Sequence, residues 1–187
     1  MDSKLLRWSF LLVAVLSLVA LPAFAQVTVI LTRHAEKAAT PKDDPPLSAA
    51  GQKRAEMLAA MLADSGVDAI YVTELQRTQK TAAPLAERVH VAPTVIPAND
   101  TAQLMKTIRA RDNGVVVVVG HSNTVPDIIA ALGGPKVDIP DPQYDNLFVL
   151  TVGPSQSSLL RLHYGGSSPL TTPTGSMHDM MTPPPRN

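Results

Sequence analysis

Short apolar runs and amphipathic segments alternate along the central part of the chain. Apolar and β-branched residues fill the runs Val27–Thr32, Asp68–Thr73, Thr94–Ile96, Val115–Val119, Asn146–Val152 and Ser158–Tyr164. Runs of this length and composition predict β-strands. The run from Val115 to Val119 consists of valine alone and has no polar face, which is typical of a central strand in a parallel sheet with helices on both sides.

Four segments between these runs carry apolar residues at helical spacing. They extend from the N-cap Ser48 to Gly66, from Gln76 to Val89, from Thr101 to about Arg111, and from Thr124 to Leu132. Pro84 lies inside the second segment and should kink or restart that helix, because an interior proline removes a backbone hydrogen bond and clashes one turn back. The alternation predicts an α/β fold, a three-layer α/β/α sandwich with a mostly parallel sheet. The last two strands flank Gly153-Pro154-Ser155 and should form a hairpin.

The N-terminal segment has the pattern of an export signal. Two basic residues precede the apolar run 9–21, and Ala23-Phe24-Ala25 has the small-x-small pattern of a signal peptidase site. We therefore expect a signal peptide over residues 1–25 and an exported protein, periplasmic or secreted, that begins at Gln26. After cleavage no stable membrane span is expected. The alternative is that the same segment stays uncleaved as a membrane anchor.

The C-terminal segment has the composition of a tail without a fixed structure. From Gly165 to Asn187 the chain is rich in proline, serine and threonine and has no apolar periodicity. The globular domain is therefore expected over residues 26–164, followed by a disordered tail over residues 165–187. Truncation after Tyr164 is expected to leave activity and thermal midpoint nearly unchanged.

Composition excludes several classes of function. Sixteen Lys and Arg residues balance sixteen Asp and Glu residues, and no stretch concentrates the basic ones, so a nucleic-acid partner is not expected. The chain has no cysteine, which excludes disulfides, thiolate zinc sites, iron–sulfur clusters and a cysteine nucleophile. Nothing in the composition indicates an oligomeric state.

Polar residues suited to phosphoryl chemistry follow three of the predicted strands. Thr32-Arg33-His34-Ala35-Glu36-Lys37 ends the first strand, Thr73-Glu74-Leu75-Gln76-Arg77 ends the second, and Gly120-His121-Ser122-Asn123 ends the valine strand. Ligands of an open parallel sheet bind at the carboxyl ends of its strands. One imidazole can attack phosphorus, while the other imidazole and two guanidinium groups bind the phosphoryl oxygens. These strand ends therefore predict a site for a phosphorylated small molecule.

The motifs together resemble those of the histidine phosphatase superfamily, which has the phosphoglycerate-mutase-like fold. The resemblance rests on Thr32–Lys37, on Pro46-Leu47-Ser48-Ala49-Ala50-Gly51-Gln52, on Glu74-Leu75-Gln76-Arg77-Thr78-Gln79-Lys80-Thr81-Ala82, and on Val119-Gly120-His121-Ser122-Asn123-Thr124. They occur in the order of the family, and the match spans Val27 to Tyr164. Ala35 stands where the family usually has glycine, a change that matters only if this position needs a positive φ.

The resemblance implies a role for four residues. His34 would be the nucleophile that becomes a phosphohistidine, and Arg33, Arg77 and His121 would complete the phosphate pocket. The implied reaction is hydrolysis of a phosphomonoester or phosphoramidate with neither metal nor cofactor. The connection 88–103 is short, leaving little material for a lid that excludes water, so hydrolysis is expected rather than mutase activity.

The group that protonates the leaving oxygen is left open. One branch of the family has Asp directly after the second histidine, where this chain has Ser122. Glu36 and Asp100 are the two candidates for the general acid.

Two alternatives to a phosphatase belong to other classes. The residues around Ser122 also resemble the nucleophile elbow of an α/β-hydrolase, which would make the protein a serine esterase with His163 as its base. The second alternative is an exported protein of the same fold that binds a phosphorylated ligand without catalysis.

Overall fold

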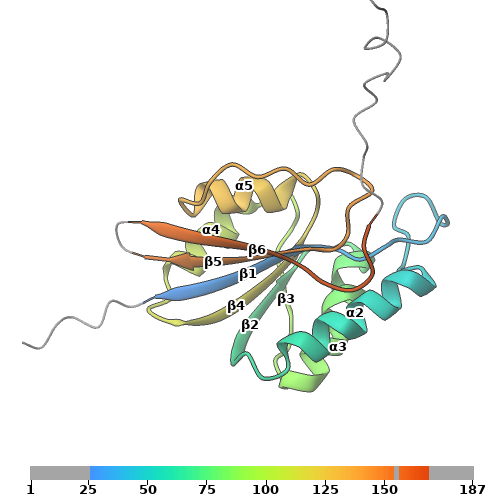
Figure 1. The fold of residues 1–187 in the computed structure, drawn as a ribbon, viewed down its shortest axis with the longest axis horizontal. Helices are drawn as coiled ribbons and strands as arrows, with labels where there is room; N and C mark the ends of the chain where they lie inside the picture. The colour runs from blue at the N-terminus through green and yellow to red at the C-terminus, as the bar shows by residue number, and fades with distance from the viewer. Residues whose placement is uncertain (1–25, 154–155, 169–187) are drawn as a thin grey trace, which may run out of the picture.

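A six-stranded mixed sheet forms the centre of the molecule in the computed structural model, which describes residues 26–153 and 156–168 (Figure 1). The strands are β1 (Val27–Arg33), β2 (Val67–Val72), β3 (Thr94–Val95), β4 (Gly114–Gly120), β5 (Asn146–Val152) and β6 (Ser157–His163). The helices are α2 (Ala49–Leu62), α3 (Gln76–Val89), α4 (Thr101–Arg109) and α5 (Thr124–Ala131). The expected signal peptide lies outside the described residues.

The strand order is β3-β2-β4-β1-β5-β6, which places the valine strand β4 between β1 and β2. β1, β2, β3 and β4 are parallel, β5 is antiparallel to β1, and β6 pairs with β5 as the expected antiparallel hairpin. The register aligns Arg33 with Gly120 and Val72 with Val119. The carboxyl ends of three adjacent strands therefore reach the same edge of the sheet.

Helices cover both faces of the sheet, with α4 and α5 on one face and α2 and α3 on the other (Figure 1). Successive residues of β1 enter opposite cores: Val29 and Leu31 pack with the residues of α4 and α5, whereas Ile30 packs with those of α2 and α3. The valines of β4 alternate in the same way, with Val116 and Val118 in the first core and Val117 and Val119 in the second. This two-sided burial explains why the valine run has no polar face. The expected three-layer sandwich is confirmed.

The start of α2 matches its sequence signal. The hydroxyl of Ser48 accepts a hydrogen bond from the amide of Gly51 at 3.2 Å and caps α2. Gly51 also lies so close to the carbonyl of Glu36 that a Cβ atom would collide with it. Glycine at this position therefore lets the start of α2 approach the loop that follows β1.

Two expectations about the elements need correction. α3 continues through Pro84 as one helix, so the proline does not restart it. Ala82 and Leu85 are fully buried beside the proline, and their packing offsets the single lost hydrogen bond. The domain also extends beyond Tyr164, because Ser168 is buried and its hydroxyl accepts a hydrogen bond from the amide of Tyr144. Residues 169–187 of the expected tail lie outside the described residues.

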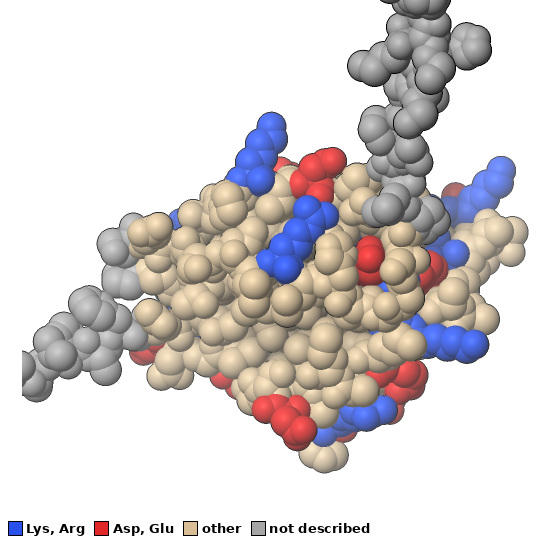
Figure 2. All heavy atoms as spheres, in the orientation of Figure 1, with Lys and Arg blue, Asp and Glu red and all other residues tan. Residues whose placement is uncertain are grey.

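Charged side chains of both signs are interspersed on the face that Figure 2 shows, without a continuous basic patch. Within residues 26–153 and 156–168, no helix is long and apolar enough to cross a membrane.

Candidate active site

The four residues that the sequence singled out meet at the carboxyl edge of the sheet. His34 follows β1, His121 follows β4, and Arg77 lies in the first turn of α3, just after β2. The amide of His34 donates to the carbonyl of Gly120 at 2.8 Å, which continues the pairing of β1 with β4 by one residue. The rings of His34 and His121 consequently lie edge to face, with their centroids 5.4 Å apart.

His34 is held in one tautomer by its own loop. Its side chain is buried, and Nδ1 lies 2.7 Å from the carbonyl oxygen of Ala35. A carbonyl oxygen only accepts, so Nδ1 carries the proton and Nε2 keeps its lone pair. No hydrogen bond among the described residues uses Nε2. The backbone of Ala35 has no positive φ, because within the described chain His90 is the sole residue other than glycine with one. Alanine therefore replaces the family's glycine here without strain.

The environment keeps both histidines neutral. Burial lowers the pKa of His34 to about 3, against the hydrogen bond to Ala35, and the positive charge of Arg33 lowers it further. Burial also lowers the pKa of His121 to about 4, and the charge of Arg77 acts in the same direction, while the carboxylate of Glu74 opposes it. Near neutral pH, both rings are therefore uncharged and can act as a nucleophile or as hydrogen-bond partners.

These shifts predict that acid destabilises the folded protein. Below the unfolded pKa of 6.5, the unfolded chain binds a proton at each histidine that the folded protein does not bind, so the free energy of unfolding falls as the pH decreases from 6.5 towards 4. The largest slope expected is about 1.4 kcal/mol per pH unit for each histidine. Urea denaturation at pH 7, 6 and 5 would measure this slope.

A variant of His34 tests its share of this slope. His34→Gln should lower the slope of the unfolding free energy between pH 6.5 and 4 by the contribution of one proton. A slope in His34→Gln equal to that of the wild type would show that His34 is not held neutral in the folded protein.

α3 ties the two loops of the site together. Thr81 accepts a hydrogen bond from the amide of Ala35 at 2.9 Å and donates to the carbonyl of Arg77 at 2.7 Å. One turn earlier, the hydroxyl of Thr78 accepts from the amide of Thr73 at 3.1 Å. The Thr73 hydroxyl lies 3.2 Å from Nε2 of His121. The helix that contains Arg77 therefore also positions the loop after β1, which contains His34, and the side chain of His121.

Both arginines keep a buried donor without a partner. The Nε–H groups of Arg33 and Arg77 are inaccessible to solvent and have no hydrogen-bond partner among the described residues. A buried donor in this state costs free energy, so each group can bind an acceptor that enters the site. The Nε–H group of Arg111, which precedes β4, is also buried without a partner in the described part of the chain, so the indication of a ligand comes from the position of Arg33 and Arg77 beside the histidines. The charges of both arginines act on both histidines, which shows that the four side chains lie close together. A phosphoryl group has the charge and the acceptor oxygens that this set requires.

Glu36, one candidate for the general acid, is committed to a structural ion pair. Both of its carboxylate oxygens accept hydrogen bonds from Arg54, at distances from 2.7 to 3.0 Å. Burial by itself raises the pKa of Glu36, but the hydrogen bonds from Arg54 outweigh it and the pKa is lowered. Both oxygens of Glu36 are therefore occupied by Arg54, so this carboxylate is not free to reach a leaving group.

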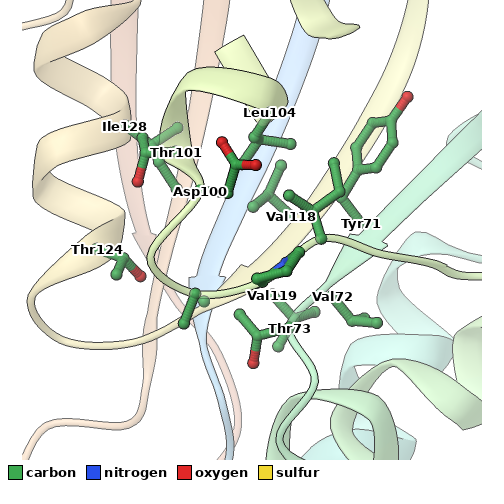
Figure 3. Close-up of a pocket in the computed structure, with 14 residues that line it drawn as sticks. Tyr71, Val72, Thr73, Asp100, Thr101, Leu104, Val118, Val119, Thr124 and Ile128 are labelled. Atoms are coloured by element: carbon green, nitrogen blue, oxygen red, sulfur yellow. The ribbon is translucent and has the colours of Figure 1, made fainter.

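Asp100, the other candidate, lines a pocket at the end of β4, just before His121 (Figure 3). The pocket lies between β2, β4, α4 and α5, has a cavity volume of about 20 Å³, and shares Thr73 and Gly120 with the strand ends described above. Its remaining lining is mostly apolar, with Tyr71 and Leu104 among the labelled side chains. One oxygen of Asp100 accepts from the amide of Gln103 and caps α4, which leaves the second oxygen available.

Arg54 connects the C-terminal segment to the loop that follows β1. Arg54, which binds Glu36, also donates to the carbonyl of Tyr164 at 2.7 Å and to that of Gly166 at 3.0 Å. The buried hydroxyl of Tyr164 lies 3.2 Å from the hydroxyl of Thr32 in β1. Sequence reasoning ended the domain at Tyr164, before the contact of Gly166, because carbonyl acceptors carry no signal in a sequence.

Truncation within this segment should therefore have an effect. A protein ending at Ser168 should keep the wild-type thermal midpoint, whereas one ending at Tyr164 loses two hydrogen bonds worth together about 2 kcal/mol, or roughly 5 °C. Its kcat/KM should also fall, because Arg54 and Tyr144 lose contacts. Equal melting curves for the two truncated proteins would show that residues 165–168 add nothing to stability.

The elements of a serine esterase are not assembled. His163 is mostly exposed on β6 and its Nδ1 lies 3.1 Å from Asp145. No hydrogen bond among the described residues joins Ser122 to a histidine. Over the same residues, no group of three His, Cys, Asp or Glu side chains is arranged to hold a metal ion.

Sequence reasoning did not identify the segment before β5 as part of the site, although Asp141 and Tyr144 contact Arg33 there. The ring of Tyr144 lies 5.9 Å from that of His34, and the guanidinium of Arg33 stacks on it at 4.1 Å. Asp141 forms an ion pair with Arg33 at 2.6 Å. The one signal for these residues was an aromatic residue, Tyr144, directly after the run Pro140–Gln143 in an otherwise aromatic-poor chain.

Comparison with known structures identifies the fold. The protein histidine phosphatase SixA complexed with tungstate has a TM-score of 0.62 at 17% identity, covering 73% of this chain and 96% of that chain. SixA from Agrobacterium tumefaciens, described as a phosphohistidine phosphatase, has a TM-score of 0.57 at 24% identity, covering 72% and 97%. A mycobacterial glucosyl-3-phosphoglycerate phosphatase has a TM-score of 0.59 at 14% identity, covering 74% and 99%. No curated protein matches the chain in sequence.

The sequence itself matches a family model. Residues 29–100 match the model of the histidine phosphatase superfamily (branch 1), a range that includes Arg33, His34 and Arg77. Over these residues the chain resembles the histidine phosphatase superfamily, and its fold is that of the phosphatase structures compared above. The match to this family model supports a phosphatase activity, and the structural neighbours support the fold.

Proposed function

We propose that the protein is a phosphatase that hydrolyses a phosphomonoester or a phosphoramidate through a phosphohistidine on His34, without a metal. The observation that carries this proposal is the state of His34. Its ring is buried and neutral, Nδ1 is bound to the carbonyl of Ala35, and two arginines with unpartnered Nε–H groups lie beside it. This arrangement presents a nucleophilic nitrogen together with donors for an anion.

In the first step, Nε2 of His34 attacks phosphorus. The N–P bond forms while the bond between phosphorus and the leaving oxygen breaks, and its electron pair stays on that oxygen. Arg33, Arg77 and His121 stabilise the charge on the phosphoryl oxygens, a contribution that depends on donors already in place. In these roles the two guanidinium groups supply the positive charge that a metal ion provides in other phosphatases.

In the second step, water attacks the phosphohistidine. The N–P bond breaks, its electron pair returns to Nε2, and a proton of the attacking water passes to solvent. The free alcohol or amine and inorganic phosphate are the products. His34 returns to its starting tautomer, because the hydrogen bond from Nδ1 to Ala35 persists through both steps.

Asp100 is the better placed donor for the leaving oxygen. Glu36 is bound on both oxygens by Arg54, whereas Asp100 uses one oxygen as a helix cap and lines the pocket next to Thr73. An alkyl ester needs such a proton, whereas an aryl ester has a leaving group that departs as an anion and a phosphoramidate can take up the proton on its own nitrogen. The leaving group of an ester substrate would then lie over the pocket of Figure 3.

A hydrolysis screen in EDTA tests this function. Protein purified from residue 26 onward should release inorganic phosphate from at least one phosphorylated metabolite, and vanadate, which mimics five-coordinate phosphorus, should inhibit it. A fluorophosphonate should not label Ser122. Labelling of Ser122 would favour the esterase, and binding of phosphate with no turnover on any ester would favour the non-catalytic binding protein.

We also propose that this reaction takes place outside the cytoplasm, since the sequence of residues 1–25 has the pattern of a cleaved signal peptide. Intact-mass measurement on protein from the extracytoplasmic fraction should give a chain that begins at Gln26. A mass that retains residues 1–25 would favour the membrane anchor.

A further inference from the structure

Arg33 is bound more extensively than the other residues of the site. Its side chain is almost fully buried, and the segment from Pro140 to Tyr144 surrounds its guanidinium group. Nη1 donates to the carbonyls of Asp141 and Gln143, the latter at 3.2 Å, and lies 3.5 Å from that of Pro140. Nη2 donates to the Asp141 carboxylate at 2.6 Å and lies 3.4 Å from the Tyr144 hydroxyl.

These contacts leave a single donor for a substrate. A guanidinium group has five N–H donors, four of them on the two Nη atoms. The segment 140–144 offers five acceptors to those four, so both Nη atoms are satisfied within the protein. Nε–H remains buried without a partner among the described residues, as does Nε–H of Arg77. The guanidinium cannot rotate to offer an Nη atom to a ligand without breaking these contacts.

We infer that Asp141 is a positioning residue that, with the segment 140–144, fixes Arg33 so that its Nε–H group binds the phosphoryl group. This inference rests on the proposed function. Asp141 supplies the one negative charge among the acceptors on Arg33, and a charged acceptor binds a guanidinium about twice as strongly as a neutral one. Its own side chain is 92% exposed, so it packs against little else. Its main contribution is therefore the orientation of Arg33.

The same segment places an aromatic wall beside the nucleophile. Tyr144 lies between Arg33, which stacks on its ring, and His34, whose ring centroid is 5.9 Å away. The amide of Tyr144 is held in turn by Ser168 at 2.8 Å. A change in the orientation of Arg33 would therefore also move a side chain in contact with His34.

Binding of inorganic phosphate tests this inference without requiring turnover. Calorimetric titration should show that Asp141→Ala weakens phosphate affinity about tenfold, because a misplaced binding group loses most of its contribution. Asp141→Asn keeps an oxygen acceptor for Nη2 and should lose no more than about threefold. Asp138→Ala, an exposed position on the same connection, is the control and should bind as the wild type does. The thermal midpoints of all three variants should stay unchanged.

The results distinguish this inference from the proposed function. Phosphate affinity in Asp141→Ala that equals or exceeds that of the wild type would overturn the inference, since the carboxylate would then be neutral to the ligand or compete with it for Arg33. That result would leave a phosphatase that acts through His34 intact. Conversely, a wild-type protein that binds phosphate but hydrolyses no ester would remove the proposed function, while the order of affinities among the variants would still support the inference.

Discussion

Replacing His34 with alanine should lower kcat/KM for any phosphorylated substrate by about 10⁴-fold or more, because removal of a covalent nucleophile leaves only the binding groups of the site. No other side chain can substitute for it. His121 is the nearest imidazole, but its Nε2 lies 3.2 Å from the hydroxyl of Thr73. The measurement is the rate of phosphate release on a substrate found in the screen.

A second variant guards against loss of the fold. His34→Gln keeps most of the side-chain volume in this buried position and cannot form a phosphohistidine. It should be as inactive as His34→Ala while retaining the far-UV circular dichroism of the wild type. Activity within about tenfold of the wild type in either variant would exclude His34 as the nucleophile.

Replacing Arg77 with alanine should lower kcat/KM by about 10² to 10³, the usual effect of removing one donor that stabilises transition-state charge. The fold should persist, because Arg77 lies at the start of α3 and the buried contacts of that helix come from Thr78, Thr81, Ala82 and Leu85. Steady-state kinetics on the same substrate would measure the loss. Because Arg77 lowers the pKa of His121, the acid limb of the pH profile should also shift towards higher pH.

Arg88 provides a matched control on the same helix. Its side chain is exposed and forms an ion pair with Glu56 at 3.3 Å on the surface. Arg88→Ala should therefore change kcat/KM by less than about twofold. Wild-type rates in both Arg77→Ala and Arg88→Ala would place Arg77 outside the phosphate pocket.

The sequence was sufficient to predict the fold because its strongest local patterns agree with each other. Five valines without a polar face require a strand covered on both sides, and β4 lies in the middle of the sheet. The positions of Arg33, His34, Arg77 and His121 followed from the same rule, since residues after adjacent parallel strands meet at one edge. Of the two effects expected of Pro84, a restart of the helix does not occur, because burial of its neighbours outweighs the local preference of proline.

The partners of these residues could not be predicted in the same way. Glu36 looked available as an acid, yet it pairs with Arg54, which lies 18 positions later in the chain. The contacts of Arg33 come from a segment more than 100 positions away and involve three backbone carbonyls. Backbone acceptors exist at every residue, so a sequence holds no signal for which of them a side chain will reach.

Rapid quench of the reaction into base tests most directly whether a phosphohistidine forms on His34. With a substrate radiolabelled in its phosphoryl group, nucleophilic attack by His34 predicts a labelled protein within the first turnover. The label should be stable in base, released in acid and absent from His34→Gln. This behaviour is characteristic of a phosphohistidine and follows from attack by Nε2 of His34. Turnover without a labelled protein, or an acid-stable label that persists in His34→Gln, would contradict it.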